Sequence, residues 1–111
     1  MDTAALLEKL QNKQMPFASV IEYIESRYVH TPTAFVNGTQ KNGASENQGS
    51  AKVFGFAALE KLTAADTLLL FAEHYDAVLA NPEGTDHQNI RQFMISGWDG
   101  IAFEGIALQA K

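Results

Sequence analysis

Apolar residues recur at three- and four-residue spacing in the first quarter of the chain. A stripe of leucines near the N-terminus predicts a short helix that Asp2 or Thr3 can cap. Pro16 suits the first turn of a second helix. The apolar face of that second helix would comprise Phe17, Val20, Ile21, Ile24 and Tyr28. Pro32 disfavours helix in the residue before it, so this helix is expected to end near His30.

Between residues 31 and 50 the helical period disappears and polar residues dominate. Asn37-Gly38 and Asn42-Gly43 are dipeptides typical of turns. Only Phe35 and Val36 are large and apolar, and we expect them to anchor the segment to the core. The pattern predicts a long polar loop, and loops of this length in small domains are often functional.

The next segment, residues 51–62, is apolar on almost every side. Periodicity alone does not decide the structure of residues 51–56. They can form part of a buried helix, or a short strand that is followed by a helix. Thr63 and Asp66 resemble a capping box, with Asp in place of the usual Glu. They predict one central helix that continues until Asn81-Pro82 stops it.

The last third of the chain predicts one more helix and an irregular tail. Asp86 or Thr85 can cap a helix that ends at Gly97, and residues 98–108 suggest an apolar strap or a short strand. The expected fold is therefore mainly α. It is a compact single-domain bundle of about five helices with a long polar loop, and it spans residues 1–111.

Composition removes several classes of function. The 111 residues include no cysteine, which excludes disulfides, thiolate zinc sites and a cysteine nucleophile. The net charge is −5 and the basic residues are scattered singly, which argues against nucleic acid and anionic membranes as partners. No apolar run reaches the ~18 residues that span a bilayer, and the N-terminus does not resemble a secretory signal. We expect a cytoplasmic protein.

The segment PEGTDHQNIR, residues 82–91, is the strongest candidate for chemistry. Asp86, His87 and Arg91 would place an acid, an imidazole and a guanidinium near the edge of an apolar helix face, where acid–base work is possible. A structural interpretation stays open beside it. In that case Asp86 caps the helix, Gly84 supplies a positive φ, and Arg91 pairs with Asp86 or Glu83. An anion site is disfavoured here, because Asp86 already faces the helix start.

A metal site or another cofactor is not expected. The available ligands are His30, His74, His87, Glu46, Glu73, Asp76 and Asp86. No HxxxH or HExxH spacing occurs among them, and His74 fits a half-buried packing position better than a ligand position.

Four segments together resemble a known family. They are FVNG (35–38), ENQGSAKVFGFA (46–57), PEGTDHQNIRQFM (82–94) and GWDGIAF (97–103), and they resemble the HopJ type III effector family over at least residues 15–108. The resemblance implies an effector that a type III apparatus translocates into a host cell, and it implies no established reaction. The family's polar motif positions correspond here to Asn37, Glu46, Asn47, Ser50, Asp86, His87, Asn89 and Arg91.

These positions lie in the long loop and in the segment 82–91, so we expect the two segments to meet in a shallow polar cleft. The leading hypothesis is a binding module for a small ligand or a partner protein. The alternative is a small enzyme in which His87 is the acid or base, Asp86 or Glu46 orients it, and Arg91 holds an anionic group. A capping role without further function also stays open. The sequence decides neither whether the chain is an enzyme nor its oligomeric state.

Overall fold

Six α-helices and five short strands make up the chain in a computed structural model that describes residues 2–111. The helices are α1 (Thr3–Gln11), α2 (Phe17–Arg27), α3 (Gln48–Leu59), α4 (Ala64–Leu69), α5 (Glu73–Ala80) and α6 (Gln88–Ser96), followed by the 3-10 turn η1 (Gly97–Gly100). The strands are β1 (Tyr28–His30), β2 (Phe35–Asn37), β3 (Gln40–Asn42), β4 (Ile101–Phe103) and β5 (Leu108–Ala110). The prediction of a mainly α fold is therefore wrong, because the fold is mixed α/β with two small antiparallel sheets. None of the helices described is long and apolar enough to cross a membrane.

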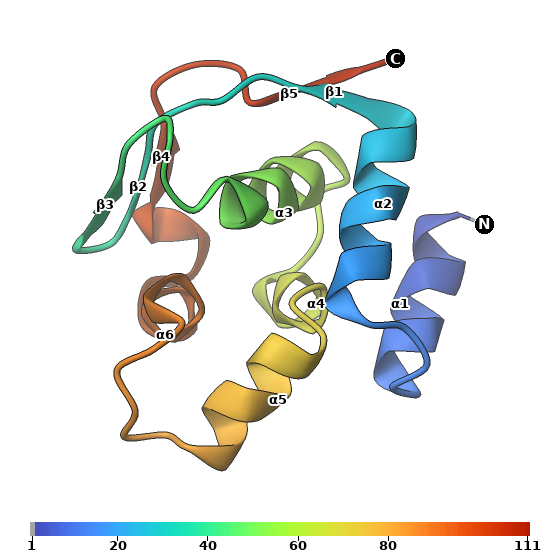
Figure 1. Cartoon of the computed structure of the whole chain (residues 1–111), viewed down its shortest axis with the longest axis vertical. Coiled ribbons are helices and arrows are strands. Elements are labelled where there is room, and N and C mark those ends of the chain that lie inside the picture. Colours follow the sequence, from blue (N-terminus) through green and yellow to red (C-terminus); the bar gives the residue numbers. More distant parts are fainter. Residues whose placement is uncertain (1) are drawn as a thin grey trace.

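The first two helices follow the predicted pattern until the end of α2. The Asp2 carboxylate accepts a hydrogen bond from the Ala5 N–H and caps α1 as expected. Helix α2 ends at Arg27, before the predicted end near His30. The next three residues become β1 because they pair with β5 at the other end of the chain, with Tyr28 opposite Ala110. Figure 1 shows this two-stranded sheet lying across one end of the molecule.

The expected long polar loop instead contains a β-hairpin. Strands β2 and β3 pair antiparallel around Gly38-Thr39, and β4 pairs with the other side of β2. Gly38 has a φ of +58°, which glycine adopts without strain. The inward residues Asn37 and Asn42 are polar but buried, so the strands lack the apolar alternation by which a strand is recognised.

Helix α3 is the centre of the core, and residues 51–56 are helical throughout. It contributes five buried residues: Ala51, Val53, Phe54, Phe56 and Ala57. Each buried Phe side chain contributes roughly 2–3 kcal/mol of hydrophobic stabilisation. Figure 1 shows α3 between α2 on one side and the β2–β3–β4 sheet on the other.

The helix predicted from residue 64 to residue 80 is two helices. Thr63 caps α4 through the Asp66 N–H, as the sequence indicates. The chain then breaks at Ala72, whose φ of 51° and ψ of −124° are not helical. Helix α5 therefore starts in a new direction and approaches the start of α6. This break accounts for six helices rather than about five.

Candidate functional site

Two clefts of similar size open on the surface, and one of them collects residues that the sequence singles out. The cleft of about 530 Å³ between the α1–α2 turn and α5 contains none of the predicted site residues. The other has a volume of about 550 Å³, and we call it the histidine cleft. It is lined by the start of α3 (Asn47, Gly49, Ser50), the α4–α5 joint (Phe71, His74), the start of α6 (His87, Gln88, Asn89, Ile90), Phe17 and Gln40.

Helices α3 and α6 both begin at this cleft, and the chain enters each through a left-handed residue. Asn47 precedes α3 with φ 50° and ψ 39°, and His87 precedes α6 with φ 50° and ψ 47°. Asn and His tolerate this conformation better than most residues. Neither side chain caps its helix. The N-cap position of α6 is His87, so the predicted cap by Asp86 or Thr85 is wrong. The first backbone N–H groups of two helices are thus left without side-chain partners beside one cleft.

A network of asparagine amides holds these two helix starts together. The Asn89 side chain exchanges hydrogen bonds with Asn42, at 3.0 Å and 3.2 Å. Asn42 Oδ1 also accepts from Asn47 Nδ2 at 2.7 Å. Asn37 Nδ2 donates to the backbone oxygen of Asn89 at 2.8 Å and to its Oδ1 at 3.1 Å. The β-hairpin therefore fixes α6 to α3 through buried polar contacts, which position the helices more specifically than apolar packing does.

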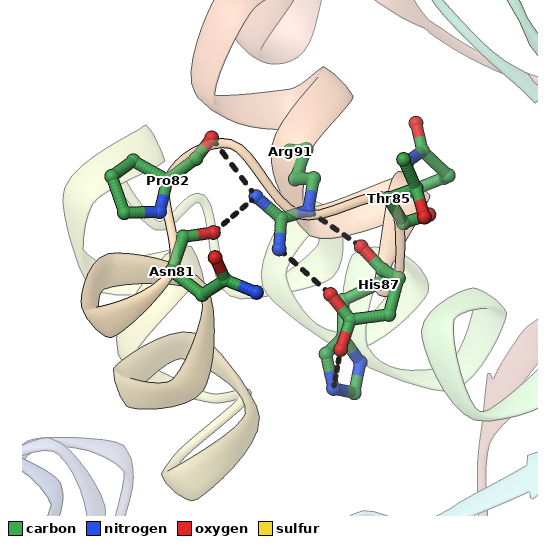
Figure 2. Close-up of polar contacts among 7 residues, drawn as sticks. Asn81, Pro82, Thr85, His87 and Arg91 are labelled. Atoms are coloured by element: carbon green, nitrogen blue, oxygen red, sulfur yellow. Dashed lines mark hydrogen bonds and ion pairs between the residues drawn. The ribbon is translucent and has the colours of Figure 1, made fainter.

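Arg91 organises the segment between α5 and α6. Its guanidinium donates to the backbone oxygens of Asn81 and Pro82, at 2.9 Å and 3.2 Å, and so satisfies carbonyls at the end of α5. It also donates to the backbone oxygen of Asp86 at 2.6 Å and to its carboxylate at 2.7 Å. Figure 2 shows the guanidinium between Asn81 and Pro82 on one side and the backbone beside His87 on the other. The predicted pairing of Arg91 with Asp86 is confirmed.

Gly84 and Asp86 both lie close to the Arg91 guanidinium. Gly84 does not have the expected positive φ. Because it has no side chain, the Arg91 and Asn81 side chains can lie close to its backbone. A Cβ added there would lie 2.6 Å from Arg91 Nη2 and 2.6 Å from Asn81 Nδ2. The hydrogen bond from Arg91 lowers the pKa of Asp86 below its ordinary value of 3.8. Asp86 is thus an ionised partner of Arg91 rather than a helix cap.

Two histidines face each other in the cleft. The His74 and His87 rings have centroids 5.0 Å apart, and His74 also packs edge-on against Phe17 at 4.9 Å. The interpretation of His74 as a half-buried packing residue agrees with this contact, but His74 also lines the cleft. Among the eleven lining residues the two imidazoles are the only ionisable side chains.

The carboxylates nearest to the imidazoles along the chain are occupied elsewhere. Asp86 Oδ2 lies 3.9 Å from His87 Nε2, which is too long for a hydrogen bond. Glu73 accepts a hydrogen bond from the Phe17 N–H at 2.7 Å, at the start of α2. Burial alone would raise the pKa of Glu73, but hydrogen bonds from the N–H groups of Phe17 and of Glu73 itself and the charge of His74 bring it below its ordinary value. Glu46 accepts from the Gly43 N–H in its own turn.

Four of the residues singled out from the sequence line the cleft together: Asn47, Ser50, His87 and Asn89. The other four do not line it. Asn37 is fully buried behind Asn89, Glu46 closes its own turn, and Asp86 and Arg91 form the support described above.

Sequence reasoning missed the role of Phe17, Gln40, Phe71 and Gln88 in the cleft and assigned His74 to packing alone. No pattern marks these residues, because only the hairpin and the break at Ala72 bring them beside α6. The side chains that the sequence offers as possible ligands are not grouped at one place. Among residues 2–111, no three His, Asp or Glu side chains are grouped so that they could hold a metal ion.

Comparisons with known proteins find one matching family and one similar solved structure. The HopJ type III effector protein family matches residues 3–108, nearly the whole chain. A solved crystal structure, that of the unknown function protein VPA0580, is 44% identical in sequence and superposes with a TM-score of 0.91. That alignment covers 100% of this chain and 95% of the other. No curated protein matches the chain.

Proposed function

The chain belongs to the HopJ type III effector protein family, and from this premise and the geometry of the histidine cleft we propose that it is a small-molecule-binding module. One observation carries the proposal. Three segments far apart in sequence, at the starts of α3 and α6 and at the α4–α5 joint, line one cleft with hydrogen-bonding and aromatic side chains. Pockets of this volume with a few convergent polar groups are typical sites for small ligands.

The alternative, acid–base catalysis by His87, has less support. His87 has no carboxylate within hydrogen-bond distance, since Asp86 is 3.9 Å away and is held by Arg91. Glu46 is bound to Gly43 and does not line the cleft. A general base needs an orienting partner and a free approach to its substrate. The arrangement supports recognition better than proton transfer.

A cleft-filling substitution tests the proposal. Ser50 lines the cleft and is half-buried, so Ser50→Leu would occupy space that a ligand needs. The experiment is a thermal-shift screen of small polar metabolites against the wild type, Ser50→Leu and Ser45→Leu. Ser45 is exposed in the turn that precedes α3 and lies outside the cleft, so its variant is the matched control.

We expect at least one compound to raise the Tm of the wild type and of Ser45→Leu but not of Ser50→Leu. Compounds that stabilise all three proteins equally, or none at all, would contradict binding in this cleft.

Translocation into a host cell is a separate proposal that rests on the family alone. Under this proposal the protein is in the bacterial cytoplasm before it is delivered into the host cell. A reporter enzyme fused to the C-terminus and active only in host cytosol tests delivery. Signal that depends on a working type III apparatus supports it, and signal that is absent or independent of the apparatus contradicts it.

A further inference from the structure

The lining of the histidine cleft has an unusual balance of charge for an acidic protein. The whole chain carries a net charge of −5, yet no Asp or Glu side chain lines the cleft. The ionisable lining groups are His74 and His87, and an imidazole donates an N–H when neutral and carries a positive charge when protonated. Every charge that the lining itself can acquire is therefore positive.

The two nearest carboxylates along the chain already have donors, although Asp86 Oδ2 also lies 3.9 Å from His87 Nε2. Asp86 pairs with Arg91 at 2.7 Å, and the Arg91 side chain is only 12% exposed. Glu73 binds the backbone N–H of Phe17. The objection that Asp86 occupies the start of α6 does not hold, because its carboxylate makes no hydrogen bond to the α6 backbone.

The lining also contains a hydroxyl donor that has no partner among the residues described. Ser50, half-buried on α3, makes no side-chain hydrogen bond to any of the residues described. The side-chain amide of Gln40 also lines the cleft, as does that of Gln88, whose Nε2 donates to the backbone oxygen of Thr85. The starts of α3 and α6, whose cap residues make no side-chain cap hydrogen bond, also lie at the cleft. Phe17 and Phe71 add aromatic rings to the lining.

We propose that the histidine cleft binds a small molecule through an oxyanion, a phosphate or carboxylate group, held between His74 and His87 and by the Ser50 hydroxyl. The inference deepens the proposed function and rests on it. The rest of the ligand would lie against the rings of Phe17 and Phe71. Phosphate and carboxylate share the chemistry that this site recognises, which is several acceptor oxygens on one negative centre.

The test is an NMR titration of the ¹⁵N-labelled chain with inorganic phosphate and, separately, with acetate, at constant ionic strength in sodium chloride. We expect saturable shifts of the Gly49, Ser50, Gln88 and Asn89 amides that fit one Kd. Saturation by phosphate would indicate a phosphorylated ligand, and saturation by acetate alone would indicate a carboxylate.

Three variants make the titration specific. His74→Gln and His87→Asn should each weaken binding by at least about fivefold, the loss of one hydrogen bond to an ion. Asn is chosen for position 87 because it tolerates the left-handed backbone. His30→Gln is the matched control, since His30 lies on β1 outside the cleft, and its Kd should stay within about twofold.

Several results would overturn the inference. The absence of a saturable shift with either anion would do so, as would equal weakening in all three variants. Zinc added alone that shifts both cleft imidazoles, with no response to anions, would make this a cation site. If neutral compounds move the cleft resonances and anions do not, the oxyanion inference fails while the proposed function stands. If no compound moves them, both fail.

Discussion

Arg91 shows how one side chain can set the position of another without touching a ligand. Its planar guanidinium donates to the end of α5 and to both the backbone and the carboxylate of Asp86. Because His87 directly follows Asp86, these bonds fix the backbone from which the His87 ring enters the cleft. A single ammonium cannot reach such divergent acceptors at once.

Arg91→Lys should therefore destabilise the fold although the charge is kept. We expect the free energy of unfolding to fall by about 2 kcal/mol, since backbone oxygens lose donors that a charged group supplied. Urea denaturation followed by circular dichroism measures this loss. The matched control is Lys13→Gln, which removes an ion pair with Asp76 whose side chains are 71% and 46% exposed. That change should cost less than about 0.5 kcal/mol, and equal costs for the two variants would show that Arg91 is only a surface charge.

The Asp86–Arg91 pair also predicts a pH dependence of stability. The folded pKa of Asp86 lies below its ordinary value of 3.8, so the pair stabilises the fold above that value. The stabilisation is lost as the pH falls through the folded pKa. The urea midpoint of the wild type should drop between roughly pH 5 and pH 3.

Asp86→Asn should lower the urea midpoint at pH 5 and should make its decline with acid shallower. A residual decline is expected, because the pKa of Glu73 is lowered too. Wild-type and variant curves that run parallel over this range would be inconsistent with the assignment.

At the scale of elements, the errors of sequence reasoning share a physical origin in long-range contacts. Tyr28–His30 leave the helical pattern because β5, about eighty residues later, supplies strand partners. The sequence pattern did not predict the hairpin β2–β3, because Asn37 and Asn42 occupy inward positions that usually hold apolar residues. Local signals succeeded where local chemistry decides the structure, as in the Asp2 and Thr63 caps.

The contact between the β2–β3 turn and the end of η1 predicts a sensitive glycine. A Cβ at Gly100 would lie 2.9 Å from the backbone nitrogen of Gly38 and 2.8 Å from Ser96 Cβ. Backbone cannot move aside cheaply, so Gly100→Ala should destabilise the fold by about 1–3 kcal/mol. Thermal melting should show a Tm lower by at least about 5 °C.

Gly105→Ala is the control for that experiment. A Cβ at this position meets its nearest atom, Thr33 Cγ2, at 3.7 Å, which is an ordinary contact. Its Tm should stay within about 3 °C of the wild type. An equal Tm for the two variants would contradict the close contact between Gly100 and Gly38.

At the scale of the whole molecule, the fold gathers into one cleft residues as far apart in sequence as Phe17 and Ile90. Sequence reasoning found the starts of α3 and α6, because their polar residues stand out from the apolar pattern. It could not place Phe17 and His74 beside them, since this depends on the packing of α2 and on the break at Ala72. It also could not separate Asn89, which lines the cleft, from Arg91, which supports it.

The central claim is that the starts of α3 and α6 and the α4–α5 joint form one binding site, and chemical-shift mapping tests it most directly. The probes are a set of small neutral heterocycles, sugars, phosphates and carboxylates, added singly to the ¹⁵N-labelled chain. The account predicts that an active probe shifts residues 47–50, 71–74 and 87–90 together, with one common Kd. Shifts confined to one of the three segments, or located around the cleft between the α1–α2 turn and α5, would contradict it.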